Sequence, residues 1–317
     1  MNIVVLSQCF FDAAQLRRLS RLGTLSLYQN TRTEALAAKR LANAQIVIAN
    51  GLTTPLTKNV LKNAPRLKLL VLNSTGFDFV DTAFARLRGI NIANTPGFAA
   101  GAIAEHTLAL TLAVIRKIAS GDKAMRKHPF AIDPAVSRHN QFLGFNLKNK
   151  NLGILGYGSI GKRVAKLGKA LGMNILVHAR KTNIELPAKM TRVSIKSLFK
   201  KSDVLSLHLP LNKKTEHVIS IKELRLMRET VVIINTARGK LIKENDLYEF
   251  LKLHKNAGAG LDVIDNTSPR NKLLRLSNVV FSPHSAWWTK ESVAQQSKTI
   301  VDSVESFVGG RPINIVN

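Results

Sequence analysis

The sequence predicts an α/β protein with parallel sheets, and three observations support this prediction. Short apolar runs alternate with helical patterns along the 317 residues, which is typical of strands and helices in parallel α/β folds. The apolar run at 152–155 breaks into Gly156-x-Gly158-x-x-Gly161 and then into a helical pattern. Separate series of strands are expected on either side of residue 150, so the chain is expected to hold about two domains.

The N-terminal part of the chain is expected to form one α/β unit. Its buried parallel strands are predicted at 3–6, 46–49, 69–72 and 90–93, where short apolar runs occur. A loop at 94–101 leads into a long helix predicted at 102–117. Residues 119–147 show little periodicity, so no regular element is assigned to them.

The following elements are expected to form a second unit. Its strands are predicted at 152–155, 175–178, 204–209, 231–235, 258–262 and 279–282. Ser220 and Glu223 have the spacing of a capping box, which predicts a helix start there. A last helix at 289–308 is closed by Gly309 and Gly310, and the tail that follows is long enough to return to the first unit.

The glycine motif has a physical interpretation. Gly156 permits a tight turn, Gly158 lets backbone N–H groups approach a pyrophosphate, and Gly161 lets the helix pack closely on the strand. The N-terminus of the helix at 159–171 adds the positive end of a dipole. A tight strand-to-helix turn needs glycine whether or not it binds a ligand, so the motif alone does not decide the function. The second apolar run at 174–178, however, completes a strand–helix–strand unit and favours dinucleotide binding.

The end of the second strand predicts which dinucleotide is preferred. NAD sites usually place an Asp or Glu there to bind the ribose 2′-OH. This chain instead reads Val177-His-Ala-Arg180-Lys181, without a carboxylate that would repel a 2′-phosphate. Arg180 and Lys181 are suited to hold that phosphate, although two solvated surface bases would have the same sequence. NADP(H) is therefore expected to be preferred, with NAD(H) possible.

Composition restricts the class of protein. The chain is 45% hydrophobic with a mean hydropathy near zero, and no apolar run reaches membrane-spanning length. Its N-terminus has a strand pattern without the features of a signal peptide, so a cytoplasmic protein without membrane association is expected. Cys9 is the single cysteine, which excludes an intramolecular disulfide and a cysteine-cluster metal site. The histidines show no metal-ligand spacing, and no metal is predicted.

The net charge of +27 comes from 47 basic and 20 acidic residues. Such an excess raises the question of a nucleic-acid or membrane partner. The bases are scattered in small groups, with no basic tail and no aromatic-interleaved stripe. They are interpreted as solvated surface that steers anionic substrate and cofactor, and no specific nucleic acid is expected as a partner.

Two residues have the chemistry needed to reduce a 2-oxo acid. The reaction needs a cation that holds the carboxylate and polarises the carbonyl, and an acid that titrates near neutral pH. Arg238 and His284 are residues of these types, and Arg238 lies just past the end of a predicted strand of the second unit, where ligands bind in such sheets. Considered singly, each is also compatible with a surface arginine or a hydrogen-bonded loop histidine.

Several motifs together resemble the D-isomer-specific 2-hydroxyacid dehydrogenases over nearly the whole chain. They are, in order, NSTGFDFVD at 73–81, NTPG at 94–97, AEHTLAL at 104–110, the glycine motif, NTARG at 235–239, GLD at 260–262 and SPHSA at 282–286. The Ala-Trp pair at 286–287 is similar to the glycerate dehydrogenase/hydroxypyruvate reductase branch.

The resemblance implies a domain organisation. A Rossmann NAD(P)-binding domain at 98–288 is inserted into a smaller flavodoxin-like α/β substrate domain made of 1–97 and 289–317. A dimerisation arm is implied near 119–147, so a homodimer is expected. Because the Glu105-His106 pair matches a structural pair of the family, it is interpreted as domain packing.

The resemblance also implies roles for individual residues. Arg238 is the substrate-binding arginine and His284 the acid/base. The loop of Ser74, Thr75 and Gly76 binds the substrate carboxylate. The residues implied to bind the cofactor are Gly156, Gly158, Ser159, Ile160, Gly161, Arg180, Lys181, His208, Pro210, Thr236, Ala237 and Asp262, of which Asp262 orients the nicotinamide.

One position departs from the family pattern. Most members have a glutamate five residues after the Asp262 equivalent, where it raises the pKa of the catalytic histidine. This chain has Thr267 there, which cannot stabilise an imidazolium as an anion would. Asp265 is the alternative partner for His284 if the loop takes another path.

Two functions are consistent with these observations. The first is an NADP-preferring oxidoreductase that interconverts glyoxylate, hydroxypyruvate or a similar 2-oxo acid with its D-2-hydroxy acid. The second is a catalytically weak, dinucleotide-sensing interaction protein of the C-terminal-binding-protein type. Intact Arg238 and His284 favour the enzyme, whereas Thr267 gives the second function some weight.

Overall fold

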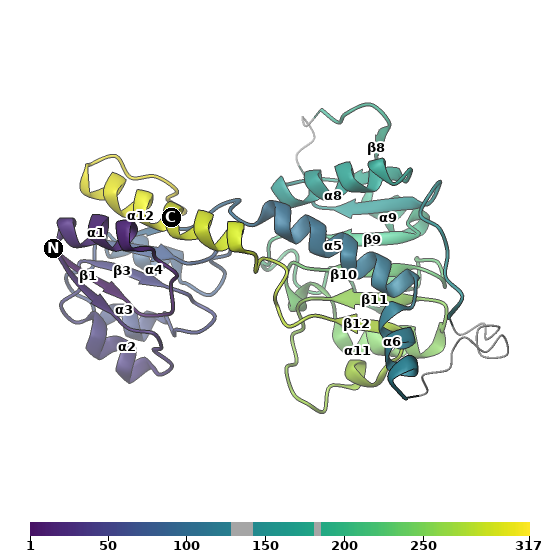
Figure 1. The fold of residues 1–317 in the computed structure, drawn as a ribbon, viewed down its shortest axis with the longest axis horizontal. Helices are drawn as coiled ribbons and strands as arrows, with labels where there is room; N and C mark the ends of the chain where they lie inside the picture. The colour runs from purple at the N-terminus through teal and green to yellow at the C-terminus, as the bar shows by residue number, and fades with distance from the viewer. Residues whose placement is uncertain (128–141, 181–184) are drawn as a thin grey trace. The chain divides into compact units, whose positions relative to one another are not determined.

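The computed structural model describes residues 1–127, 142–180 and 185–317. The chain divides into two compact units (Figure 1). Met1–Ala99 and Trp288–Asn317 form the terminal unit, and Ala100–Trp287 form the central unit. Each unit contains a parallel sheet with helices, so the predicted α/β fold class is confirmed.

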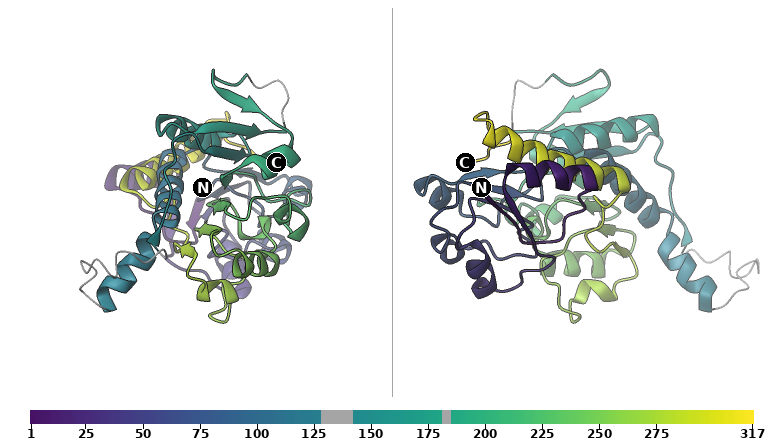
Figure 2. Two further views of the ribbon diagram at one scale, coloured as in Figure 1. Left: turned by 90° about the vertical axis from the view of Figure 1, so that its right-hand side faces the viewer. Right: turned by 60° about the vertical axis from the view of Figure 1, so that its left-hand side comes forward.

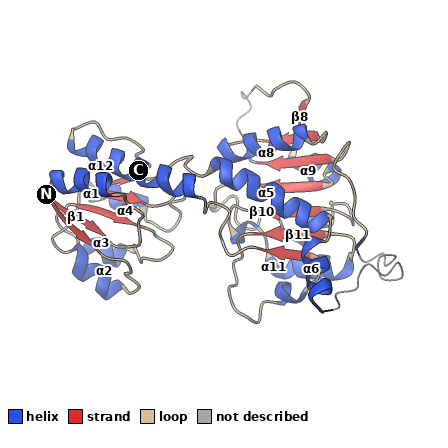
Figure 3. Ribbon diagram, viewed as in Figure 1, coloured by secondary structure: helices blue, strands red, loops and turns tan. Residues whose placement is uncertain are grey.

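The terminal unit contains a five-stranded parallel sheet in the order β2-β1-β3-β4-β5, which is the flavodoxin-like order. The strands are β1 (Asn2–Val5), β2 (Thr24–Leu27), β3 (Ile46–Ala49), β4 (Leu69–Leu72) and β5 (Asn91–Ala93). The helices are α1 (Ala13–Leu22), α2 (Glu34–Leu41), α3 (Lys58–Lys62), α4 (Thr82–Leu87) and α12 (Lys290–Val308), and Figure 3 shows them on both faces of the sheet.

Alternation of side chains along the strands gives this sheet two buried faces. Ile46 and Ile48 of β3 pack in one core with Ile300 and Val304 of α12. Val47, between them in sequence, packs in the other core together with residues of α2 and α3. Helix α12 thus belongs to the same fold as the N-terminal strands, although most of the chain separates them.

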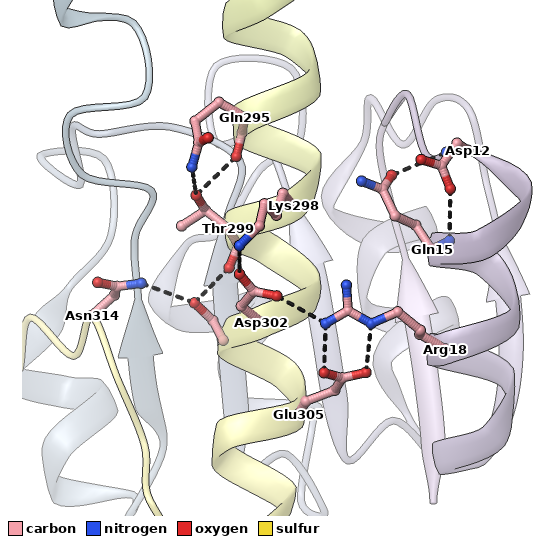
Figure 4. Close-up of polar contacts among 10 residues, drawn as sticks. Asp12, Gln15, Arg18, Gln295, Lys298, Thr299, Asp302, Glu305 and Asn314 are labelled. Carbon is pink, nitrogen blue, oxygen red and sulfur yellow. Dashed lines mark hydrogen bonds and ion pairs between the residues drawn. The ribbon is translucent and has the colours of Figure 1, made fainter.

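A charged network also joins α12 to α1 (Figure 4). The Arg18 guanidinium donates to both carboxylate oxygens of Glu305, at 2.8 and 2.6 Å, and to Asp302 at 2.8 Å. Lys298 donates to the other Asp302 oxygen at 2.7 Å. The hydrogen bond from Arg18 lowers the pKa of Glu305. These side chains are about one-third exposed or more, so solvent screens much of their attraction.

The central unit contains a seven-stranded parallel sheet in the order β12-β11-β10-β9-β6-β7-β8. Its strands are β6 (Asn151–Leu155), β7 (Asn174–His178), β8 (Met190–Arg192), β9 (Val204–Leu207), β10 (Val232–Asn235), β11 (Gly258–Leu261) and β12 (Val279–Phe281). Its α-helices in the described residues are α5 (Ala100–Ile115), α6 (Ile118–Lys127), α8 (Ser159–Ala170), α9 (Ile195–Lys201), α10 (Ile221–Leu224) and α11 (Glu244–Leu253). Figure 2 gives two further views of the chain, in which this unit carries the blue-to-green colours of its residues.

Buried cores cover both faces of this sheet. Leu110 and Val114 of α5 and Val164 of α8 pack with Ile154 and Ile234 on one face. Residues of α9, α10 and α11 pack with other strand residues in a second core. With strands buried on both faces, the functional groups are left to the loops at the strand ends.

The predicted elements agree with the structure except at two edge strands and at α6, which forms where the weak periodicity had predicted no regular element. Glu223 accepts a hydrogen bond from the Ser220 backbone at 3.0 Å, as the capping box predicts. The sequence did not predict β2 and β8, which are both edge strands. Neither strand contains a buried residue, so their sequences lack the apolar run that marks the inner strands.

No helix in the described part of the chain combines the length and the apolar composition needed to cross a membrane.

Candidate functional site

The glycine loop follows β6 and has the geometry of a phosphate cradle. Gly156 has a φ of +100°, and a Cβ there would lie 2.7 Å from the His208 carbonyl oxygen. A Cβ on Gly161 would lie 2.2 Å from the carbonyl oxygen of Gly156, whereas one on Gly158 would meet open space. The loop thus packs tightly at its ends and is open at its middle, as approach of a pyrophosphate requires.

Helix α8 begins directly after this loop. Gly158 is its N-cap, so no side chain caps the helix, and Ser159 and Ile160 form its first turn. N–H groups at such a helix start are suited to an anion. These residues therefore fit the phosphates of a dinucleotide.

The residues expected near the adenosine lie around the same loop. His208 follows β9, and its Nε2 is 2.8 Å from the Ser206 Oγ. Burial lowers the pKa of His208 to about 3, so its imidazole is neutral at physiological pH. Pro210, two residues further, is exposed.

At the expected ribose position, Arg180 is exposed two residues after β7 ends. Ala179 precedes it. Lys181, the second base expected there, lies outside the described residues.

Arg238, Asp262 and His284 come from the ends of three neighbouring strands. They follow β10, β11 and β12, which are adjacent in the sheet. Because the strands are parallel, their carboxyl ends lie at one edge of the sheet, where ligands bind in this type of fold. The structure therefore places a cation, a carboxylate and an imidazole on adjacent loops.

Asp262 is the organising residue of this edge. It is 3% exposed, and its carboxylate accepts hydrogen bonds from the Ser282 Oγ at 2.6 Å and from the backbone N–H groups of Ser285 and Ala286 at 2.9 and 3.1 Å. Its backbone carbonyl accepts a hydrogen bond from the His284 N–H at 2.9 Å. The carboxylate thereby fixes the loop that carries the histidine.

His284 is held in an uncommon backbone conformation, with a φ of +55°. Burial lowers the pKa of its imidazole, the positive charge of Arg238 lowers it further, and the charge of Asp262 opposes both effects. The two charged groups that influence His284 are thus its neighbours on the adjoining strand ends.

The loop of Arg238 is fixed from two sides. The Asn235 side chain donates to the Arg238 carbonyl at 2.9 Å and accepts from the Ala237 N–H at 3.0 Å. A Cβ on Gly239 would lie 2.3 Å from the carbonyl carbon of Ile264, so the two loops are in direct contact. The Arg238 guanidinium donates to the Ala237 carbonyl at 2.8 Å and also interacts with other groups.

Thr236 is buried in the same loop. Its Oγ1 lies 3.1 Å from the Oγ1 of Thr107 on α5. Thr236 and Ala237 are thus held at the edge that also carries Asp262.

The two alternative partners of His284 lie on the loop that follows Asp262. Thr267 and Asp265 are both exposed, and in the described residues no hydrogen bond joins either of them to His284. Glu244, at the start of α11, accepts hydrogen bonds from the backbone N–H groups of Asp265 and Asn266 and from the Asn271 side chain. Glu244 thus fixes the course of this loop.

His106 has a position that the sequence did not reveal. Its Nε2 lies 2.8 Å from the Ser282 Oγ and 3.6 Å from an Asp262 carboxylate oxygen. The sequence interpretation as domain packing thus omitted a polar contact with the Asp262 network. An apolar helical pattern around His106 gives no signal for a partner at residue 282, which is far away in sequence.

In the terminal unit, the loop after β4 carries Ser74, Thr75 and Gly76. The carbonyl oxygens of all three accept hydrogen bonds from within the unit, from the Thr95 N–H, the Asn94 side chain and the Ser74 Oγ. The Thr75 side chain donates to the Thr95 carbonyl at 2.8 Å. The loop is therefore anchored through its acceptor groups.

The chain is similar to a known family and to several known proteins. The family model described as the NAD-binding domain of D-isomer-specific 2-hydroxyacid dehydrogenases matches residues 108–286. A glyoxylate reductase of Thermococcus litoralis is 38% identical over 84% of this chain and 81% of its own length. A glycerate dehydrogenase of Methylorubrum extorquens is 33% identical over 91% of this chain and 90% of its own length.

Among solved structures, an acyclic imino acid reductase, Bsp5, in complex with NADPH and D-Arg superimposes with a TM-score of 0.91 at 32% identity, with both chains fully covered. Its match extends the similarity to both units of the fold. With the family model covering more than half of the chain and relatives above 30% identity over most of it, the chain belongs to the D-isomer-specific 2-hydroxyacid dehydrogenases, a family of NAD(P)-dependent oxidoreductases that interconvert 2-oxo and 2-hydroxy acids.

Proposed function

We propose that this protein is an NADP-preferring reductase that converts a small 2-oxo acid of the glyoxylate or hydroxypyruvate type into its D-2-hydroxy acid. The observation that carries the proposal is the placement of Arg238, Asp262 and His284 on three adjacent strand ends. The relatives named glyoxylate reductase and glycerate dehydrogenase support the choice of small acids.

Each residue of this cluster has a chemical task. Arg238 binds the substrate carboxylate and polarises the carbonyl that will be reduced. A reduced nicotinamide cofactor, when bound, would supply the hydride for the carbonyl carbon. The His284 imidazolium donates its proton to the oxygen that becomes the hydroxyl, and Asp262 supports this proton donor by raising its pKa. In the opposite direction neutral His284 accepts the hydroxyl proton.

The loop of Ser74, Thr75 and Gly76 is proposed to bind the substrate carboxylate through its backbone N–H groups. Its carbonyl oxygens already accept hydrogen bonds inside the terminal unit. An anion needs N–H donors, and the amide groups of this loop are proposed to supply them.

The cofactor preference is proposed from the end of β7. Arg180 is exposed there, and residues 177–180 include no carboxylate that would repel a 2′-phosphate. The acyclic imino acid reductase, which matches this chain over the full length of both proteins, was solved with NADPH, and this supports the proposal.

Arg180→Ala is expected to weaken NADPH binding by about tenfold or more, because it removes a charge-assisted pair with the 2′-phosphate. NADH affinity should change little, since NADH carries no phosphate at this position. Titration of each reduced cofactor by its fluorescence on binding measures both dissociation constants. Equal changes for the two cofactors would contradict the role of Arg180.

Steady-state oxidation of NADPH with glyoxylate, hydroxypyruvate and pyruvate in turn is the direct test of the proposed activity. We expect turnover with at least one of the small acids and a higher kcat/KM with NADPH than with NADH. A protein that binds the dinucleotide tightly but turns over none of the acids would support the dinucleotide-sensing alternative.

A homodimer formed through the region near 119–147 is also proposed. Helix α6 contains no buried residue, and Ile118 and Met125 are 57% and 40% exposed on it. Part of the proposed arm, 128–141, lies outside the described residues. Light scattering after size exclusion should give twice the chain mass, and a monomer at micromolar concentration would contradict the proposal.

A further inference from the structure

A second arginine lies beside the proposed 2′-phosphate position. The edge strand β8 pairs with β7 in parallel, and Arg192 is the register partner of Val177. The Arg192 Nη1 donates to the Ala179 carbonyl oxygen at 3.4 Å, directly before Arg180. Pairing of the two strands thus brings a second exposed guanidinium to the end of β7.

The position of β8 is fixed by several contacts. The Val193 N–H donates to the Val177 carbonyl at 3.0 Å, and the Val193 carbonyl lies 3.1 Å from the His178 Nδ1. At the start of the strand, the Tyr157 hydroxyl donates to the Met190 Sδ at 3.4 Å. Because Tyr157 belongs to the glycine loop, β8 is anchored both to that loop and to the end of β7.

We propose that Arg192 is a second specificity-determining residue, which binds the 2′-phosphate of NADP(H) together with Arg180. This inference rests on the proposed NADP preference and assigns a residue of β8 to it. A phosphate monoester near neutral pH has nearly two negative charges and three acceptor oxygens, more than one guanidinium can satisfy. Guanidinium groups from β8 and from the end of β7 would bind it from two elements.

The contact with the Ala179 carbonyl is compatible with this role. That carbonyl holds the guanidinium beside the ribose position, and Arg192 also takes part in another interaction. A guanidinium carries five N–H donors, so contacts of this kind do not prevent it from binding a phosphate as well. An arginine held in advance also loses less side-chain entropy when a ligand binds.

The two adenosine fragments 2′,5′-ADP and 5′-AMP are suitable probes, because they differ only in the 2′-phosphate and require no turnover. Calorimetric titration should give wild-type protein a clear preference for 2′,5′-ADP. Arg192→Gln should weaken the binding of 2′,5′-ADP by about tenfold or more. It should change the affinity for 5′-AMP by no more than about twofold. Arg192→Lys keeps the charge but loses the planar fork, so an intermediate loss is expected.

A matched control removes one positive charge at the other edge of the same sheet. Arg275 is exposed and precedes β12, whereas β8 is the opposite edge strand. Arg275→Gln should leave both affinities unchanged if the effect of Arg192 is local. Thermal melting of each variant without ligand tests whether the fold is intact.

The outcomes separate this inference from the proposed cofactor preference. If wild-type protein prefers 2′,5′-ADP and only Arg180→Ala abolishes the preference, the NADP proposal stands and the role of Arg192 is wrong. If Arg192→Gln lowers the affinities for both probes equally, Arg192 has only a structural role and the inference is wrong. If wild-type protein binds both probes equally, both proposals are wrong.

Discussion

Arg238→Ala is expected to lower kcat/KM for reduction of a 2-oxo acid by about 10²–10³-fold or more, which is the effect of removing one electrostatic catalytic group. The guanidinium would no longer hold the carboxylate or stabilise the negative charge that develops on the carbonyl oxygen. Cofactor affinity should remain largely unchanged, because the glycine loop and the end of β7 are separate from this residue. Steady-state kinetics and cofactor titration measure the two effects.

The Lys240→Ala variant is the control that separates the loss of a positive charge from the loss of the Arg238 contacts with the substrate. Lys240 is exposed two residues further along the same loop, so its removal changes the local charge equally but removes no proposed substrate contact. We expect activity close to wild type. An Arg238→Ala variant with nearly wild-type turnover would remove Arg238 from the site.

His284→Ala is expected to reduce turnover by about 10²–10⁴-fold, the usual contribution of a general acid. Wild-type reduction also has a defined pH dependence. Burial and the charge of Arg238 lower the pKa of His284, and reduction requires its protonated form. The reduction rate should therefore fall as pH rises through a pKa below the ordinary histidine value.

Oxidation of the 2-hydroxy acid requires neutral His284 and should rise with pH through the same pKa. In the His284→Ala variant, both the fall of the reduction rate and the rise of the oxidation rate with pH should disappear. This holds provided that hydride transfer with its coupled protonation limits the rate. Solvent isotope effects test this condition. A variant with unchanged pH profiles in both directions would exclude His284 as the proton donor.

The loop of Thr267 supplies a related comparison. Thr267→Glu should move the alkaline limb of reduction to higher pH only if the new carboxylate reaches the imidazole. Thr267 is exposed and Glu244 holds the neighbouring backbone, so the structure favours a small shift. A large shift would mean that this loop approaches His284 during turnover. Asp265→Asn tests the other proposed partner in the same way.

The sequence by itself determined the fold class and the inner strands. Strands such as β3 and β4 are buried along their full length, so each is an uninterrupted apolar run that a single sequence reveals. The glycine motif was equally informative, because positive φ at Gly156 and close packing at Gly161 exclude most other residues. Arg238 and His284 have the required chemistry, and the resemblance to the family made them the candidates.

Only the tertiary structure decided which distant residues meet. His106 lies on α5 in an apolar pattern, yet it contacts the Ser282 and Asp262 network. Arg192 lies on an edge strand whose sequence, Met-Thr-Arg, has no periodic signal, and strand pairing brings it to Ala179. Local patterns record burial and turn geometry within a few residues. Contacts across a sheet depend on strand order and register, which form only when the whole core packs.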